Sequence, residues 1–325
     1  MNILVTGGAG YVGSVCAEQL VKENHRVVVY DNLSAGHRAA VSPGAVFVRG
    51  ELADAPKLHT VLRRHGVEAI MHFAGKILVG ESARNPATFY ANNVSATLTL
   101  LDLAVERKIT RFIFSSSAAV YGEPQTVPIP EEHPTSPVNS YGETKLAIER
   151  ALSWYAQAYG LTYAALRYFN AAGAAARLGE DHRPETHLLP RLLDVALDPS
   201  KEFLLYGEDY PTPDGTCIRD YVHVLDIARA HILALRKLAR IKSAIYNVGL
   251  GKGYSIREVV SAAEEVTHRK INVRIGPRRP GDPARLVASP ARISSELGWE
   301  PRHSELRKIV RSAWQWKQRH PGGYK

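Results

Sequence analysis

The chain has 325 residues, of which 45% are hydrophobic and 22% are charged, and its formal net charge is +9. This is the composition of a folded globular protein, and it excludes disordered and collagen-like chains. No apolar run approaches the roughly 20 residues that a membrane-spanning helix needs, so we expect no membrane partner. Only Cys16 and Cys217 are present, and the first strand begins directly after Met1-Asn2. We therefore expect a cytoplasmic protein without a disulfide framework or a signal peptide.

The first half of the chain alternates short, β-branched apolar runs with longer helical patterns. The apolar runs predict strands at 3–6, 26–30, 45–48, 69–73, 111–115 and 162–167. The intervening patterns predict helices at 12–23, 56–64, 86–107 and 140–159. Nearly continuous apolar strands separated by helices are typical of a parallel sheet that is covered on both faces. The sequence thus predicts a doubly wound, Rossmann-like α/β fold.

This regularity ends near residue 170. The composition predicts loops at 171–185 and 207–219. Helical patterns return at 188–197, 224–238, 256–268 and 305–318. We expect a nucleotide-binding domain at 1–170 and a smaller mixed α/β lobe at 171–325, with the chain crossing between them more than once.

A glycine-rich loop joins the first predicted strand to the first predicted helix. Gly7, Gly10 and Gly13 form G-x-x-G-x-x-G, which allows a pyrophosphate to approach the backbone and the helix N-terminus. The second predicted strand is followed by Asp31, whose carboxylate can accept hydrogen bonds from ribose hydroxyls and would repel a 2′-phosphate. The pattern therefore predicts a dinucleotide site that prefers NAD to NADP. Asn32 and Ser34 add neutral polar groups there.

Tyr141 and Lys145 stand four residues apart at the start of the predicted helix 140–159. This spacing places both side chains on one face of the helix. An ammonium group near a phenol favours the phenolate, which is the form that a general base requires. The pair predicts acid–base chemistry beside the dinucleotide.

A serine-rich segment, Ser115-Ser116-Ser117, follows the fifth predicted strand and so reaches the ligand-binding edge of the sheet. A hydroxyl group there can bind an alcohol or ketone oxygen, but the sequence does not show which serine faces the site. The chain contains 13 histidines without an H-E-x-x-H motif or a Cys/His spacing typical of zinc, so we predict no metal site.

The excess of basic residues is densest at 301–325, where seven Lys and Arg residues accompany only Glu305. Basic residues elsewhere are scattered, which does not favour nucleic acid as a partner. The basic excess at 301–325 is explained either by a solvent-exposed basic face or by the binding of a small anionic substrate.

These elements together resemble the extended short-chain dehydrogenase/reductase family, and within it the family of UDP-glucose 4-epimerases. The resemblance extends in order along nearly the whole chain. It includes the segments His72-Phe-Ala-Gly75, Asn92-Asn-Val94, Arg167-Tyr-Phe-Asn170, Gly207-Glu-Asp-Tyr-Pro-Thr212 and Arg219-Asp-Tyr-Val-His223.

The resemblance implies a role for each matching residue. Tyr141 would be the acid–base group, Lys145 would hold it and the cofactor ribose, and Ser117 would bind the sugar 4-hydroxyl. The NAD contacts would be Gly7, Gly10, Tyr11, Val12, Gly13, Asp31, Asn32, Ser34, Glu51, Leu52, Phe73, Ala74, Gly75, Asn92, Ser115, Tyr141, Lys145 and Tyr168. The UDP-sugar contacts would be Ser117, Tyr141, Asn170, His187, Leu188, Tyr206, Arg219, Arg279, Asp282 and Leu286.

The reaction implied by the resemblance oxidises the sugar transiently at C4 with tightly bound NAD, and the 4-keto sugar turns over before it is reduced again. The family also implies a homodimer. Epimerisation of another UDP-sugar, such as a UDP-N-acetylhexosamine, a UDP-pentose or UDP-glucuronate, remains the main alternative. A sugar-nucleotide dehydratase is less favoured, because Ala118 and Ala119 stand where those enzymes carry an acidic pair. A non-catalytic NAD-binding regulator would not need Tyr141 and Lys145.

Overall fold

The computed structural model describes residues 1–238, 240, 243–279 and 281–324, and the chain divides into two compact units. The first unit comprises Met1–Gly122, Pro134–Arg167 and Ala228–Tyr246. The second comprises Glu123–His133, Tyr168–Ile227 and Asn247–Lys325. The chain therefore passes from one unit to the other after Gly122, His133, Arg167, Ile227 and Tyr246.

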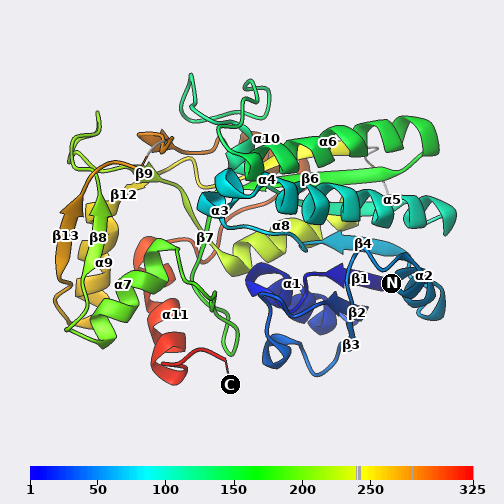
Figure 1. Ribbon diagram of the computed structural model, residues 1–325, viewed down its shortest axis with the longest axis horizontal. Coiled ribbons are helices and arrows are strands. Elements are labelled where there is room, and N and C mark those ends of the chain that lie inside the picture. The colour runs from blue at the N-terminus through cyan, green and yellow to red at the C-terminus, as the bar shows by residue number, and fades with distance from the viewer. Residues whose placement is uncertain (239, 241–242, 280, 325) are drawn as a thin grey trace. The chain divides into compact units, whose positions relative to one another are not determined.

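The first unit is built on a seven-stranded sheet with the order β11-β6-β5-β4-β1-β2-β3 (Figure 1). The strands are β1 (Asn2–Thr6), β2 (Arg26–Asp31), β3 (Val46–Arg49), β4 (Ala69–His72), β5 (Arg111–Ser117), β6 (Thr162–Tyr168) and β11 (Ser243–Val248). The pairs from β3 through β2, β1 and β4 to β5 are parallel. The predicted doubly wound α/β fold is confirmed.

Helices cover both faces of this sheet. In Figure 1, α5 and α6 lie along one face, and α1 and α8 lie along the other. The core on the α5/α6 face packs buried strand residues such as Ile70 and Phe112 against Leu101 of α5 and Leu152 of α6. The helices are α1 (Tyr11–Lys22), α2 (Ala55–Arg64), α5 (Ala96–Glu106), α6 (Ser140–Tyr159) and α8 (Val224–Lys237).

The helix predicted at 86–107 is divided in the structure. It consists of α4 (Pro86–Phe89), a π-helical segment η2 (Tyr90–Ser95) and α5. Such π segments are rare and occur often at functional sites. The sequence patterns did not predict the short helices α3 (Val79–Arg84), η1 (Arg38–Ala40) and η3 (Ala118–Val120).

The seventh strand, β11, was also not predicted. It belongs to the part of the sequence that we assigned to the second lobe, yet it pairs with β6 at the edge of the main sheet. Its partner is far away in the sequence, so local periodicity contains no information about the pairing.

Among its described residues, the second unit contains three small sheets with the orders β10-β7, β12-β9-β14 and β13-β8. Two of their strands, β7 and β9, lie partly or wholly inside segments that we predicted as loops. The strands are β7 (Asn170–Ala172), β8 (Phe203–Tyr206), β9 (Ile218–Arg219), β10 (Tyr221–His223), β12 (Tyr254–Ser255), β13 (Val273–Gly276) and β14 (Arg285–Leu286).

The helices of this unit pack around their own core, in which Leu192 of α7, Ala263 of α9 and Ile309 of α11 are buried. A capping box starts α9, because Ser255 and Glu258 each bind the other's backbone N–H group. No helix within the described ranges is long and apolar enough to cross a membrane. The helices are α7 (Leu188–Leu197), α9 (Ile256–Thr267), α10 (Ala291–Leu297) and α11 (Leu306–Arg319).

Candidate active site

The glycine-rich loop leaves β1 at the point where the strand order of the sheet reverses, which is where doubly wound folds bind ligands. Gly7 has a φ of +70°, and a Cβ atom on it would lie 2.5 Å from the backbone nitrogen of Ala74. A Cβ atom on Gly13 would lie 2.3 Å from the carbonyl oxygen of Gly7. These glycines therefore bring the loop, α1 and the segment after β4 closer together than side chains would permit.

The N-terminus of α1 lies in this loop. Gly10 is the N-cap residue and contributes no side-chain hydrogen bond, and Tyr11 and Val12 begin the first turn. A helix N-terminus offers N–H groups and a partial positive charge to an anion. The loop and helix have the features of a pyrophosphate cradle, and a Cβ at Gly7 or Gly13 would collide with the backbone that forms it.

Asp31 ends β2 and is buried. One of its carboxylate oxygens accepts the N–H of Ala9 at 3.0 Å, and the other accepts the N–H of Leu33 at 2.8 Å. Burial raises the pKa of Asp31 above its ordinary value, and the two hydrogen bonds oppose the rise. Each oxygen retains a second lone pair, so the carboxylate can still accept a hydrogen bond from a ribose hydroxyl.

Four further predicted cofactor residues follow β2 and β3. The amide nitrogen of Asn32 donates to Oε2 of Glu51 at 2.9 Å, and the N–H of Ser34 donates to the amide oxygen of Asn32 at 2.9 Å. Leu52 follows Glu51 and is half-buried. The structure thus brings the residues that follow β2 into contact with those that follow β3.

The segment after β4, which contains Phe73, Ala74 and Gly75, is held in place by Asn93 of the π-helical segment. The Asn93 amide oxygen accepts the N–H of Lys76 at 2.8 Å. Its amide nitrogen donates to the carbonyl oxygen of Lys76 and to the hydroxyl of Thr144, each at 3.1 Å. Sequence reasoning missed Asn93, although it adjoins the predicted residue Asn92, whose amide donates to Asn93 at 2.9 Å.

Tyr141 and Lys145 lie at the start of α6, which Asn139 caps by accepting the N–H of Gly142 at 2.9 Å. The ammonium nitrogen of Lys145 lies 5.8 Å from the centre of the Tyr141 ring. Tyr141 is 8% exposed and Lys145 is 4% exposed. Burial lowers the pKa of Lys145 to about 8, and the nearby charge of Glu149 opposes this shift. Lys145 therefore still carries its proton at neutral pH.

The three serines at the end of β5 differ in their surroundings. Ser115 is buried, and its carbonyl oxygen accepts a hydrogen bond from Lys145 at 2.8 Å. Ser116 is buried and donates to Oε1 of Glu149 at 2.5 Å. Ser117 is half-buried, and its hydroxyl oxygen accepts the N–H of Ala119 at 3.1 Å. Successive strand residues point to opposite faces, so Ser117 and Ser116 point to opposite sides.

A buried ion pair lies next to β5 and contacts it through Ser116. Glu149 of α6 binds Arg167 of β6 through three contacts. Nε of Arg167 donates to the two carboxylate oxygens at 2.9 and 3.2 Å, and a terminal nitrogen donates to one of them at 2.5 Å. Both side chains are almost fully buried. Arg167 also donates to the hydroxyl of Tyr121 at 2.9 Å. Because Ser116 donates to the same carboxylate, it belongs to this structural network.

His72 lies at the end of β4, where the sequence predicted a packed side chain. It is 1% exposed, and its two ring nitrogens lie 2.7 Å from the Thr6 hydroxyl and 2.9 Å from the Thr97 hydroxyl. Burial, followed by the charge of Lys145, lowers the pKa of His72 to about 3. The prediction that His72 is packed is confirmed, and the ring is neutral at physiological pH.

Five of the predicted substrate residues form two groups in the second unit. In the first group, Arg219 binds Asp282 at 2.6 Å, and Leu286 of β14 pairs with Arg219 of β9. Arg219 is 8% exposed, so its charge depends on Asp282 for compensation.

In the second group, the guanidinium of Arg279 lies 3.9 Å from the centre of the Tyr206 ring. A hydrogen bond from Arg279 is the main factor that lowers the pKa of Tyr206. Arg279 therefore covers one face of the Tyr206 ring, which lies at the end of β8.

The remaining predicted contacts lie at element ends. Asn170 begins β7 and pairs with Tyr221 of β10, and Tyr168 ends β6. His187 is the N-cap residue of α7, and Leu188 is its first residue. Tyr168 and the predicted substrate residues other than Ser117 and Tyr141 belong to the second unit, and the predicted catalytic residues belong to the first.

Comparison with known proteins identifies the group to which this arrangement belongs. The family model described as the NAD dependent epimerase/dehydratase family matches residues 3–249. The chain belongs to this family. NAD is accordingly its cofactor, and the glycine cradle and Asp31 fit it.

Individual relatives are similar over their full lengths. A curated UDP-glucose 4-epimerase of Halalkalibacterium halodurans is 48% identical, over 100% of this chain and 98% of its own. The structure of UDP-glucose 4-epimerase from Brucella ovis in complex with NAD is 46% identical with a TM-score of 0.94, over 97% of both chains. That of UDP-glucose 4-epimerase from Bifidobacterium longum in complex with NAD⁺ and UDP is 35% identical with a TM-score of 0.94, over 100% of both chains.

Proposed function

We propose that the protein interconverts UDP-glucose and UDP-galactose by inverting the configuration at the sugar C4. The observation that carries this proposal is the buried Tyr141–Lys145 pair beside a glycine cradle, in a chain that matches curated UDP-glucose 4-epimerases from end to end. Epimerisation needs one group that can both remove and return a proton, and a single phenol can serve in both directions.

The chain's own residues would hold NAD at three places. The loop from Gly7 to Gly13 and the start of α1 would bind the pyrophosphate, and Asp31 would bind the adenosine ribose. Lys145 would bind the other ribose, with its ammonium oriented by the carbonyl oxygen of Ser115. When bound, NAD supplies a reversible two-electron acceptor for the C4–H bond of the sugar.

Tyr141 would move the proton of the sugar O4. The Lys145 ammonium, 5.8 Å from the centre of the phenol ring, favours the phenolate that accepts this proton. Ser117 would donate a hydrogen bond to the same oxygen. Ala118 and Ala119 follow it and cannot transfer a proton, which disfavours a dehydratase reaction.

The UDP part of the substrate would bind to the second unit. Arg219 and Asn170 would contact the diphosphate, and Tyr206 would pack against the uracil ring. Arg279, Asp282, His187 and Leu188 would complete this region, and Leu286 would lie beside the sugar. The Leu286 side chain would limit the size of the substituent at the sugar C2. Epimerisation of a UDP-sugar with a different substituent is therefore the alternative function.

We also propose that the protein is a cytoplasmic homodimer. Trp154 and Tyr159 on α6 are 68% and 60% exposed, which is unusual for large aromatic side chains and supports an interface there. Both cysteines are unpaired and buried, which is consistent with a reducing compartment. Light scattering of the purified protein should give the mass of two chains, and a monomer at micromolar concentration would argue against the dimer.

The experiment for the activity incubates the pure protein with UDP-glucose, UDP-galactose and their N-acetylated, pentose and glucuronate counterparts, without added NAD. We expect UDP-glucose and UDP-galactose to interconvert, and denaturation of the protein to release NAD. Turnover confined to another UDP-sugar would instead support the alternative, and a lack of turnover with NAD present would contradict the proposal.

A further inference from the structure

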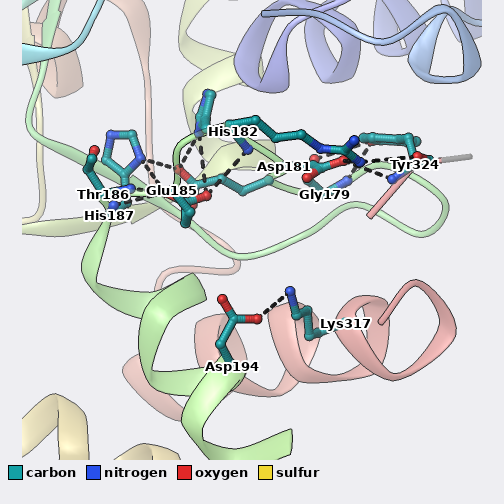
Figure 2. A network of polar contacts seen from close by, with 11 residues as sticks. Gly179, Asp181, His182, Glu185, Thr186, His187, Asp194, Lys317 and Tyr324 are labelled. Carbon is teal, nitrogen blue, oxygen red and sulfur yellow. Dashed lines mark hydrogen bonds and ion pairs between the residues drawn. The ribbon is translucent and has the colours of Figure 1, made fainter. Parts of the chain in front are cut away.

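Two carboxylates and two imidazoles gather in the segment that precedes α7, and one of the imidazoles belongs to His187, which is also a predicted UDP-sugar contact. They belong to Glu180, His182, Glu185 and His187, and one donor atom from each lies within 4.8 Å of all the others (Figure 2). The part of the chain that the structure describes contains no other group of this kind. We predicted no metal site from the sequence, because the spacing E-x-H-x-x-E-x-H matches none of the motifs that we considered.

The four side chains alternate in type around a ring. Nδ1 of His182 lies 3.3 Å from Glu180 and 3.7 Å from Glu185. Nδ1 of His187 lies 3.0 Å from each of the same two carboxylates. Metal–ligand bonds of roughly 2.0–2.2 Å in a tetrahedral site place neighbouring donor atoms roughly 3.3–3.6 Å apart. These four distances span this range, and the two pairs across the ring lie within 4.8 Å, so a tetrahedral ion fits once the atoms across the ring move closer together.

The charges are also suited to a divalent cation. Imidazole binds a metal in its neutral form, so as ligands the two histidines carry no charge and the two carboxylates give the cluster a charge of −2. A divalent cation neutralises this charge, so the occupied site contains no net buried charge.

The backbone around the cluster holds its ligands in place. Oε1 of Glu185 accepts the N–H groups of Thr186 and His187, each at 2.8 Å. Glu180 contacts both imidazoles of the cluster. The adjacent Asp181 points away from the cluster and accepts the N–H of Tyr324 at 2.8 Å (Figure 2). Such outer contacts fix the orientation of metal ligands.

The donor set selects the class of metal. Imidazole nitrogen together with carboxylate oxygen suits Zn²⁺ and its transition-metal neighbours, whereas Mg²⁺ and Ca²⁺ prefer oxygen ligands alone. Four ligands from the protein leave no open position, which is typical of structural rather than catalytic zinc. The His187 side chain is 42% exposed and provides a route of entry, while the other three are at most 16% exposed.

We propose that Glu180, His182, Glu185 and His187 bind one Zn²⁺ ion in a closed structural site that stabilises the segment leading into α7. The site is formed within the second unit by residues close together in the sequence. Zinc binding is measured without substrate, so a failure of the proposed epimerase activity would leave this test intact.

The test uses untagged full-length protein that has been treated with a chelator and dialysed against Zn²⁺, followed by elemental analysis. We expect one Zn²⁺ per chain in the wild type and its loss in Glu180→Gln and His182→Gln. The control is His59→Gln, which removes the histidine of the exposed His59–Glu106 pair in the first unit and should retain the ion. Absence of zinc from the wild type, or its retention in both cluster variants, would overturn the proposal.

A second measurement covers variants that fail to fold. Crystals of the wild type soaked in Zn²⁺ should give an anomalous scattering peak among the four side chains, and Co²⁺ in its place should give the intense visible absorption of a tetrahedral complex. A peak elsewhere, or the weak absorption of octahedral Co²⁺, would contradict the site. Mg²⁺ should not compete with Zn²⁺, and equal competition would also count against it.

Discussion

The ammonium group of Lys145 donates a hydrogen bond of 2.8 Å to the carbonyl oxygen of Ser115. This bond links the first turns of α6 to the end of β5, and so fixes the lysine with respect to the serine-rich segment. Lys145 also lies 5.0 Å from the centre of the Phe114 ring, which is buried in the sheet. A buried charge is thus held by one carbonyl oxygen and two aromatic rings, and this arrangement leads to the first two predictions.

Replacing Tyr141 with Phe should remove most of the turnover without unfolding the protein. The substitution deletes the hydroxyl that exchanges the proton and keeps the ring packing, so kcat should fall by roughly 10²- to 10⁴-fold. Steady-state kinetics and the amount of copurified NAD would be compared with Tyr159→Phe, a matched change at an exposed position of the same helix. A Tyr141→Phe protein with normal kcat would assign the base elsewhere.

The lowered pKa of Lys145 predicts a pH dependence of stability. Its value of about 8 in the folded protein lies below the ordinary 10.5, so the unfolded chain binds more protons between these two pH values. Stability from this group therefore rises as the pH increases from about 8 to about 10.5, by about 3 kcal/mol at 1.36 kcal/mol per pKa unit. Urea unfolding of the wild type and Lys145→Met across this range isolates the effect, because other titrating groups cancel. If the difference in free energy of unfolding between the two proteins stays constant from pH 8 to 10.5, the prediction is wrong.

Neighbouring serines should respond differently to the same substitution. Ser117→Ala should lower kcat by up to roughly tenfold, less than Tyr141→Phe, because one hydrogen bond is lost while the base remains. Ser116→Ala removes a bond to the buried carboxylate of Glu149 and should lower the free energy of unfolding by about 1–3 kcal/mol. Kinetics and chemical denaturation of both variants check this division. The opposite pattern would mean that Ser116 faces the substrate.

Asp31 should set the preference for NAD. Its carboxylate repels a 2′-phosphate, so Asp31→Asn should weaken this rejection and raise the affinity for NADP relative to NAD. The amide oxygen of the variant can accept the N–H of Ala9 or that of Leu33 but not both, because an NH₂ donor replaces the other carboxylate oxygen, so folding of the variant would be checked alongside. Apoprotein of each form would be reconstituted with the two cofactors and the dissociation constants compared. The same ratio in both proteins would show that another residue determines the choice.

Leu286 should limit the sugar 2-substituent. Leucine is intermediate in volume, so we expect efficient turnover of the plain hexoses and weak turnover of UDP-N-acetylglucosamine. Leu286→Tyr should suppress the N-acetyl reaction and spare the other, with roughly 1.4 kcal/mol of clash corresponding to tenfold in rate. Leu286→Met, which conserves volume, is the control. If kcat/KM falls equally for both substrates in the tyrosine variant, this residue does not limit the pocket.

The sequence alone determined the features that depend on near neighbours along the chain. The glycine spacing from Gly7 to Gly13, the position of Asp31 at the end of a strand, and the four-residue step from Tyr141 to Lys145 all follow from local periodicity. The parallel sheet followed as well, because apolar strands separated by helices have few other ways to bury both faces.

Tertiary structure decided what depends on distant partners. Ser116 and Ser117 are identical in type and adjacent, and only the buried Glu149–Arg167 pair distinguishes their roles. The contacts that Asn93 makes to Lys76 and Thr144 join three separate segments. Such contacts form only when elements far apart in the sequence pack together, and residue spacing does not encode that packing.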